Sequence, residues 1–197
     1  MRRRIVATIV GAIAIVAGAT AHAQQQTLEE KAQLCAACHG VDGKPIDPNY
    51  PIIWGQHQGY LYLQLRDFKL GARKNDLMTP VAQMLERDDM MALAEYFSKK
   101  PWPDLRQKHA SDADTAAAVR ANASIGCTGC HLGEYQGDAT VGRLAGQNHD
   151  YLLRQMLDFR SGARGNNPGM TDLMRATSES DIAALANYLA GRQATTP

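Results

Sequence analysis

The sequence predicts an all-α protein built from two tandem modules, and three observations lead to this prediction. Apolar residues recur at helical spacing in several segments of the 197-residue chain, strand-like alternation is not seen, and one set of motifs occurs twice at a nearly constant offset. The composition, with 45% hydrophobic and 21% charged residues, is that of a globular protein. A formal net charge of +1 gives no electrostatic reason to expect a nucleic-acid partner.

The first 23 residues have the pattern of a cleaved signal peptide. Three arginines at positions 2–4 precede an apolar run from Ile5 to about Ala19, and Ala21-His22-Ala23 offers a cleavage site. An uncleaved membrane anchor is the alternative, although the run is slightly short for a bilayer span. We therefore expect an exported protein.

The rest of the chain contains the same module twice. Cys35-Ala36-Ala37-Cys38-His39 recurs as Cys127-Thr128-Gly129-Cys130-His131 at an offset of 92 residues. Further matches at an offset of 91 or 92 are Gly55-Gln56 with Gly146-Gln147, Asp67-Phe68 with Asp158-Phe159, and Met78-Thr79 with Met170-Thr171. We predict a first domain at residues 24–103, a connector at 104–112 that follows Pro101 and Pro103, and a second domain at 113–197.

Each module is predicted to contain three helices. Thr27 and Glu30 form a capping sequence for a helix that leads to the first cysteine pair. Gly71 and Gly162 are natural stops for the middle helices. The other predicted helices are about Asp114–Ile125, Gln58–Leu70, Asp150–Ser161, Arg87–Lys99 and Glu179–Ala190.

The Cys-x-x-Cys-His motif in each module predicts a covalently attached haem c. Two thiols three positions apart lie on one side of a helical turn and add to the vinyl groups of the porphyrin, while the histidine binds the iron. We therefore predict two haem c groups, one attached through Cys35, Cys38 and His39 and the other through Cys127, Cys130 and His131.

Two other uses of the cysteines compete with this interpretation. A redox-active disulfide of the thioredoxin kind belongs in an α/β protein, and no strand pattern is visible here. A zinc site formed by both pairs would leave the histidine after each pair unexplained. Haem attachment accounts for both features, and it gives each small module an apolar core.

The second axial ligand of each iron should recur in both modules. Met78 and Met170 do so, each 39 residues after the motif histidine and each in a stretch that looks like a loop. Met174 is the rival in the second module. His57 and His149 are the alternative as bis-histidine ligands, but they do not align with each other in the repeat.

The residues resemble those of the dihaem cytochrome c4 family, which has two class I cytochrome c domains in tandem. The resemblance covers essentially the whole chain after the leader. It rests on the two haem motifs, the first followed by Gly40-Val41-Asp42-Gly43, and on six further segments: 50–56, Gly71-Ala72-Arg73 with Asn75 before Met78, 89–97, 144–147, 158–160 and 180–188.

This resemblance implies two His/Met-ligated haems, with His39 and Met78 on one iron and His131 and Met170 on the other. It also implies a periplasmic electron-transfer protein, soluble or loosely attached to the membrane, rather than an enzyme with a small-molecule substrate. Expected partners are redox proteins: a membrane cytochrome complex, a terminal oxidase or a dehydrogenase. The alternatives are a fixed cytochrome subunit of a periplasmic dehydrogenase, and a dihaem redox enzyme with an open iron position.

One departure from the family pattern concerns the motif histidines. The family usually has a proline whose carbonyl accepts from the motif histidine, and the resemblance assigns this place to Pro51 in the first module and to Gly142 in the second. We expect this glycine to give a looser loop around His131. Four recurring side chains are candidates for haem propionate contacts or for ordinary packing: Tyr60, Tyr151, Arg73 and Arg164.

Overall fold

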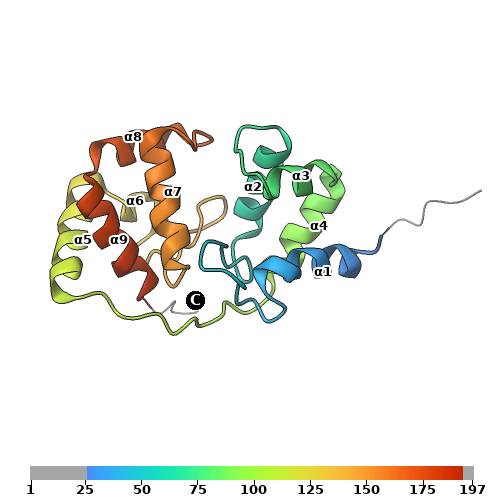
Figure 1. Ribbon diagram of the computed structural model, residues 1–197, viewed down its shortest axis with the longest axis horizontal. Helices are drawn as coiled ribbons and strands as arrows, with labels where there is room; N and C mark the ends of the chain where they lie inside the picture. Colours follow the sequence, from blue (N-terminus) through green and yellow to red (C-terminus); the bar gives the residue numbers. More distant parts are fainter. Residues whose placement is uncertain (1–25, 193–197) are drawn as a thin grey trace, which may run out of the picture.

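The computed structural model describes residues 26–192 and places two helical domains side by side (Figure 1). The predicted signal peptide lies outside these residues. The first domain contains α1 (Leu28–His39), α2 (Gln58–Lys69), α3 (Met78–Gln83) and α4 (Arg87–Ser98). The second contains α5 (Asp112–Ile125), α6 (Thr128–His131), α7 (His149–Ser161), α8 (Pro168–Ala176) and α9 (Glu179–Ala190). Residues 26–192 form no strand, only one bridge between Asp138 and Val141.

The first domain forms because local caps fix the helix ends and α4 supplies the apolar face. The Thr27 hydroxyl accepts from the Glu30 amide and the Glu30 carboxylate accepts from the Thr27 amide, which confirms the predicted capping box. Helix α4 buries Met90, Leu93 and Phe97 against α1 and α2. The predicted stop after α2 is Gly71, whose φ of 74° suits glycine.

The second domain repeats this arrangement, with α9 as its central helix. Helix α9 packs against α5 and α7, and its Ile182, Leu185 and Leu189 are buried. One difference lies at the cysteine motif. In the first domain α1 runs straight through it, whereas Gly126, with φ 71°, ends α5 and leaves the motif on the short helix α6.

Three helices within residues 26–192 were not predicted, namely α3, α6 and α8. Met78 is the first residue of α3 and Met170 lies in the first turn of α8, so the expectation that both occupy loops was wrong. The reason is local: the side chain of Asn167 caps α8 and Pro168 fits its first position, and the Asn75 side chain accepts from the backbone at the start of α3.

The connector between α4 and α5 runs along one side of both domains (Figure 1). Gln107 fastens it to the second domain, because its Nε2 donates to the carbonyl of Gln147 (2.9 Å) and its Oε1 accepts from the amide of His149 (2.9 Å). Trp102 lies under the guanidinium of Arg143, 5.1 Å from the ring centroid.

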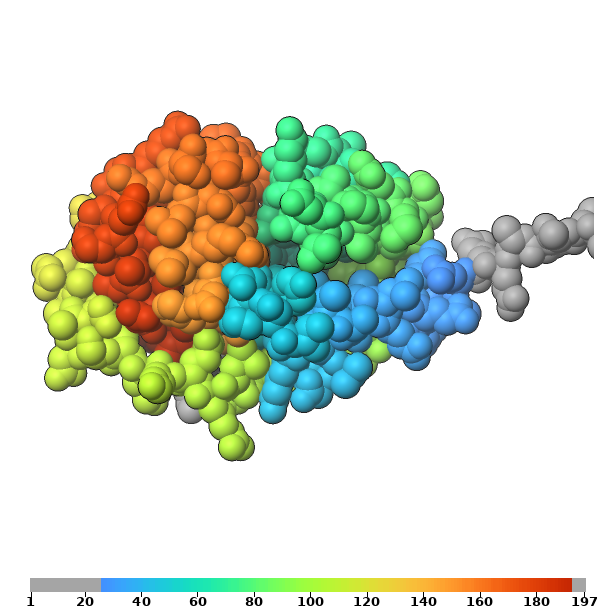
Figure 2. All heavy atoms as spheres, viewed as in Figure 1, coloured from blue at the N-terminus to red at the C-terminus, as the bar shows by residue number. Residues whose placement is uncertain are grey.

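The domains contact each other through pairs of equivalent residues. The Tyr60 amide donates to the Ala139 carbonyl (3.1 Å), and the Tyr151 amide, 91 residues later, donates to the Pro48 carbonyl (3.2 Å). Pro48 and Ala139 are also 91 residues apart, so the interface has an approximate two-fold symmetry. Figure 2 shows the two domains packed directly against each other. No helix within residues 26–192 is long and apolar enough to cross a membrane.

Candidate functional site

A cavity of about 390 Å³ lies beside the cysteine motif of the first domain. Cys35, Cys38, His39 and Met78 all line it. Its body is apolar, formed by side chains such as Leu61, Phe68, Leu93 and Phe97. Its other end reaches the second domain and is polar, with Tyr60, Gln64, Arg73, Tyr151, Gln155 and Arg164.

The two motif histidines lie in equivalent positions. The Nδ1–H of His39 donates to the carbonyl of Pro51 (2.8 Å), and that of His131 donates to the carbonyl of Gly142 (2.9 Å). A carbonyl only accepts, so the proton resides on Nδ1 and Nε2 keeps a free lone pair. Burial lowers the pKa of both histidines, although the hydrogen bond to the carbonyl opposes it. Both side chains are therefore neutral, and the Nε2 lone pair of each can bind a metal ion.

Gly142 lies against a side chain of the first domain. A Cβ on this residue would lie 2.9 Å from the ring of Tyr60, so a side chain from the first domain occupies that space. The glycine is thus required by packing between the domains. The loop that contains Gly142 packs against the Tyr60 ring of the first domain.

None of the four cysteines forms a disulfide. The Cys35 thiol donates to the Lys31 carbonyl (3.4 Å), and burial raises its pKa to about 11. Burial also raises the pKa of Cys127. Cys38 and Cys130 are exposed. A raised pKa is the opposite of what a reactive redox thiol has, which weighs against the thioredoxin-like alternative.

The structure treats Met78 and Met170 alike and Met174 differently. The backbone N–H of Met78 donates to Asn75 Oδ1 (2.9 Å), and that of Met170 donates to Asn167 Oδ1 (3.1 Å). Both methionines are half-buried. Met174 is 2% exposed in the core of the second domain, where the first domain has Ala82.

The remaining histidines lie away from the cavity. His57 Nε2 bonds the Gln136 carbonyl across the domain interface (2.8 Å), and His149 Nδ1 lies 2.7 Å from the Asp150 carboxylate at the start of α7. His109 is exposed on the connector. None of the three lines the cavity.

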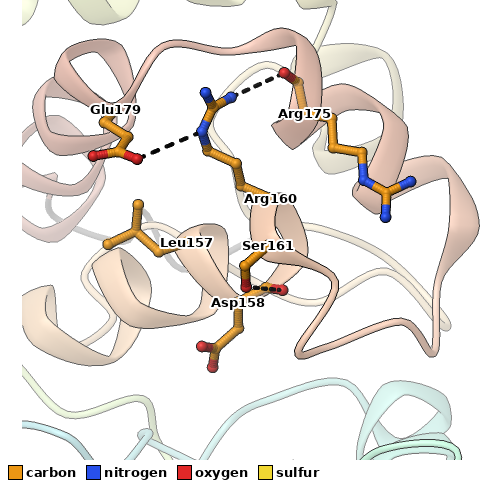
Figure 3. Close-up of a pocket in the computed structure, with 6 residues that line it drawn as sticks. All are labelled: Leu157, Asp158, Arg160, Ser161, Arg175 and Glu179. Carbon is orange, nitrogen blue, oxygen red and sulfur yellow. Dashed lines mark hydrogen bonds and ion pairs between the residues drawn. The ribbon is translucent and has the colours of Figure 1, made fainter.

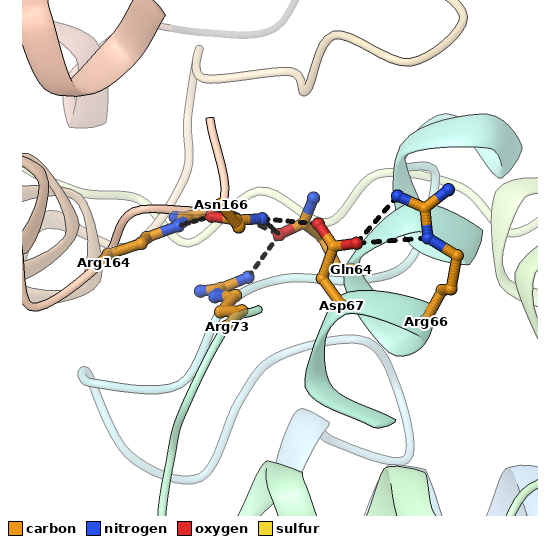
Figure 4. Close-up of polar contacts among 6 residues, drawn as sticks. All are labelled: Gln64, Arg66, Asp67, Arg73, Arg164 and Asn166. Carbon is orange, nitrogen blue, oxygen red and sulfur yellow. Dashed lines mark hydrogen bonds and ion pairs between the residues drawn. The ribbon is translucent and has the colours of Figure 1, made fainter. Parts of the chain in front are cut away.

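A buried polar network joins the domains at the polar end of the cavity (Figure 4). Gln64 Oε1 accepts from Arg73 (2.8 Å) and from Arg164 (2.9 Å), while Gln155 Oε1 accepts from the same two guanidinium groups at 2.6 and 2.9 Å. Both arginines are at most 8% exposed. Neither forms an ion pair with a carboxylate of residues 26–192.

The network also holds two carboxylates, because Asp67 accepts from Asn166 (2.8 Å) and Asp158 accepts from Gln155 Nε2 (3.2 Å). Burial would raise the pKa of Tyr151, but the charges of Arg73 and Arg164 outweigh it and hold that pKa below its ordinary value. The sequence pointed to the arginines and to Tyr60 and Tyr151 by their recurrence. Gln64 and Gln155 recur at the same offset of 91 and could have been found in the same way.

The residues present fit a haem. Its apolar porphyrin matches the body of the cavity, and its two carboxylates match the cations at the polar end. The thiols, imidazole and thioether are groups of the kinds that attach and ligate a haem c.

Comparison with known proteins gives the same answer. Residues 24–120 match the cytochrome c family. The chain is 36% identical over 179 residues to cytochrome c4 of Azotobacter vinelandii, covering 82% of this chain and 85% of that protein. The crystal structure of reduced recombinant cytochrome c4 from Pseudomonas stutzeri superimposes with a TM-score of 0.74 at 31% identity, over 86% of this chain and 100% of the other. The chain belongs to the cytochrome c4 family.

Membership of the cytochrome c4 family confirms several predictions. The protein has two tandem cytochrome c domains, carries two covalently attached haem c groups, and is an electron-transfer protein rather than an enzyme. Its partners are redox proteins. A further relative is the thiosulfate dehydrogenase electron acceptor of Stutzerimonas stutzeri (strain A1501), 34% identical over 172 residues, 81% of this chain and 79% of that protein.

A second hollow, of about 530 Å³, is open and lies on the outside of α7 and α8 (Figure 3). Arg160 crosses it and donates to the carbonyls of Arg175 (2.9 Å) and Thr177 at the end of α8, and it also lies 3.8 Å from Glu179. Lys69, its equivalent in the first domain, donates in the same way to the Leu85 carbonyl after α3. These cations stabilise helix ends, and the hollow therefore has a structural explanation.

Proposed function

We propose that this cytochrome c4 attaches its haems through Cys35 and Cys38 and through Cys127 and Cys130, with His39 and Met78 as axial ligands of one iron and His131 and Met170 of the other. What supports the assignment in the first domain is that all four of its residues line one apolar cavity. The equivalent hydrogen bonds of His131 and Met170 support the second.

In this proposal a haem c bound here supplies an iron that changes between the ferric and ferrous states. The chain contributes the backbone carbonyls, the methionine sulfur and the apolar walls. The carbonyls of Pro51 and Gly142 orient the imidazoles, and neutral methionine sulfur favours the reduced metal. The apolar walls keep water from the site, so little rearrangement accompanies the change of charge.

Arg73 and Arg164 are proposed to neutralise the haem carboxylates at the domain interface. Their charges are buried and held by the Gln64 and Gln155 side chains, so an anionic group completes the network. Placing carboxylates of both haems at one interface would bring the two prosthetic groups near each other, which allows transfer within the molecule.

We further propose that the protein works in the periplasm as a shuttle between a respiratory donor and an acceptor such as a terminal oxidase. The leader-like residues 1–23 support export, and the likeness to cytochrome c4 supports a shuttle. The proposed domain limits are 24–103 and 113–197, with the connector at 104–112. In the structure α5 begins at Asp112, the last residue of that connector.

A fixed subunit of a periplasmic dehydrogenase is the second candidate. The specific observation in its favour is the similarity to a thiosulfate dehydrogenase electron acceptor. Purification from the native cell decides between the two, followed by stopped-flow reaction of the reduced cytochrome with candidate oxidases. The shuttle proposal expects a free protein with rapid, salt-sensitive second-order oxidation. Isolation at a fixed ratio with a dehydrogenase contradicts it.

A further inference from the structure

One peptide unit in each domain connects the motif histidine to the other domain. The Pro51 carbonyl accepts from His39 Nδ1 (2.8 Å), and the Ile52 N–H of the same peptide unit donates to Gln147 Oε1 in the second domain (2.7 Å). In a planar trans peptide the C=O and N–H point in opposite directions. The peptide between Pro51 and Ile52 therefore links His39 to Gln147 in a single chain of hydrogen bonds.

The second domain has the reciprocal arrangement. The Gly142 carbonyl accepts from His131 Nδ1 (2.9 Å), and the Arg143 N–H of the same peptide donates to Gln56 Oε1 in the first domain (2.8 Å). Gln56 and Gln147 are 91 residues apart and occupy equivalent positions in the repeat. In each domain the series of hydrogen bonds that begins at the motif histidine thus ends at a glutamine of the other domain.

The two glutamine side chains are fixed. Gln147 Nε2 donates to the Ile52 carbonyl (3.0 Å), and Gln56 Nε2 donates to the Arg143 carbonyl (3.1 Å). Each is 3% exposed. Rotation of either amide by half a turn would face N–H against N–H and oxygen against oxygen, so only one orientation satisfies the backbone.

Hydrogen bonds in series strengthen one another. A glutamine oxygen that accepts from the peptide N–H makes the carbonyl of that peptide a better acceptor. A better acceptor draws the Nδ1 proton of the histidine and makes the imidazole a more basic ligand. A more basic ligand stabilises the ferric state and lowers the reduction potential.

We propose that Gln56 and Gln147 are positioning residues that act across the domain interface, Gln147 lowering the potential of the first haem and Gln56 lowering that of the second. This inference rests on the proposed ligation of iron by His39 and His131. Each domain then tunes the haem of its partner domain.

The two effects differ in size because Pro51 and Gly142 differ. The ring of proline fixes its own φ, whereas glycine leaves the backbone free to turn. The Gln56 bonds and the Tyr60 ring hold the Gly142 peptide in place from the first domain, and Trp102 packs under the Arg143 side chain. Loss of Gln56 therefore affects both the polarity and the orientation of the carbonyl that accepts from His131. Loss of Gln147 affects chiefly the polarity of the carbonyl that accepts from His39.

The test is a redox titration of the full-length holoprotein carrying Gln147→Leu or Gln56→Leu. Gln147→Leu should increase the equilibrium constant for reduction of the first haem about twofold, which corresponds to a rise of about 18 mV in its one-electron potential. Gln56→Leu should raise that of the second haem by more. Met78→His lowers the potential of the first haem only, and so identifies which wave belongs to it.

The two variants distinguish the chain of hydrogen bonds across the interface, here called the relay, from a direct effect of each glutamine on the haem of the cavity that it lines. Both glutamines also line the cavity of the first domain. A direct effect of either would move the first haem, whereas the relay predicts that Gln56→Leu moves the second. A shift of the first haem alone in both variants, equal shifts of both haems, or no shift in a low-spin protein would overturn the proposal.

Two further variants guard against a misfolded product. Gln56→Glu offers the same acceptor and donor when its carboxyl is protonated, and it should restore the second potential below the pH at which that group ionises. His57→Ala removes another bond across the interface, to Gln136, and should leave both potentials in place. A shift in this control equal to that of Gln56→Leu would contradict the relay. Failure of the ligand assignment shows separately, as a wild-type spectrum without low-spin His/Met features.

Discussion

In each domain a cation lies over two aromatic rings, but one of the two rings comes from a different position of the repeat in each domain. The cations are Lys100 and Arg192, 92 residues apart. The rings are Trp54 and Tyr96 in the first domain, and Tyr135 and Tyr188 in the second. Tyr96 and Tyr188 are equivalent in the repeat, whereas Trp54 and Tyr135 are not.

The exchange concerns one pair of positions. In the first domain Gly43 lies under the ring of Trp54, where a Cβ would come within 2.7 Å. In the second domain the equivalent of Gly43 is Tyr135 and the equivalent of Trp54 is Ala145, so the large and small residues have changed places. Burial raises the pKa of Tyr135 to about 12 and keeps its ring neutral.

The comparison teaches which features the duplicated module retains. The cation and the volume of the ring are retained, while the position that supplies the ring is not. At the candidate site the opposite holds. Cysteines, histidine, methionine, arginine and the interface glutamines stay at equivalent positions, because their chemistry depends on place as well as on size.

Removal of one cysteine pair should have the largest effect and should be confined to one domain. Cys35→Ala with Cys38→Ala deletes both thioether bonds of the first haem. We expect intact-mass measurement to show a protein with one covalent haem instead of two. Cys127→Ala with Cys130→Ala is the matched variant and should also retain one. A protein in which either double variant keeps both haems contradicts the assignment.

Loss of a methionine ligand should be the next largest effect. Met170→Ala removes the sulfur proposed for the second iron, so the long-wavelength absorption band of the oxidised Met-ligated haem should lose about half its intensity. Met78→Ala should remove the other half.

Met174→Leu is the control for this experiment. It conserves volume in the core and should cost less than about 1.5 kcal/mol without changing the band. A band that survives Met170→Ala and disappears in Met174→Leu would make Met174 the ligand.

The exchange of rings can be tested by a double-mutant cycle in the first domain. Trp54→Ala should destabilise the holoprotein by about 3 kcal/mol, because no tyrosine at position 43 fills the space. Gly43→Ala brings a Cβ against the Trp54 ring and also strains a residue with φ 81°. Once Trp54 is removed only the backbone strain remains, so the two changes should couple by about 1 kcal/mol in chemical denaturation. Strict additivity would show that the ring does not fill this position.

The smallest effect concerns an ion pair that only the first domain has. Lys31 Nζ lies 2.6 Å from Asp89 Oδ1, and the hydrogen bond to Lys31 lowers the pKa of Asp89 below its ordinary 3.8. The equivalent of Lys31 in the second domain is Ala123. Lys31→Met should cost about 0.5 kcal/mol.

The sign of the pH dependence follows from the lowered pKa. The stabilising contribution of Asp89 is complete above about pH 3.8, its value in the unfolded chain, and is lost as the pH falls through the lower folded value. The difference between wild type and Lys31→Met, measured by denaturation of the holoprotein, should therefore disappear in acid. Lys44→Met, at an exposed position, is the control. A difference that grows in acid contradicts the assignment.

The parts of the fold that could be predicted are those that depend on local chemistry. Thr27, Gly71 and Gly162 mark helix ends by caps and by backbone conformation, and the bounds of α9 agree with the prediction. Helix α8 is not predicted, because the Asn, Gly and Pro residues around Met170 favour a loop, although Asn167 and Pro168 are also a recognisable helix start.

The contacts between domains could not be predicted in the same way. The repeat revealed Gln56 and Gln147, but a glutamine gives no sign of whether it bonds its own domain or the other. The packing of Gly142 was not predicted, because the ring that lies against it, Tyr60, is about 80 residues away in sequence. Such pairings depend on how two folded domains meet.

The most direct test of the central claim is coulometric titration of the purified protein with optical detection of both haems. The account predicts two reversible one-electron steps per chain, with low-spin spectra in the oxidised and reduced states. Uptake of a single electron, or a high-spin ferrous haem that binds carbon monoxide, would contradict it.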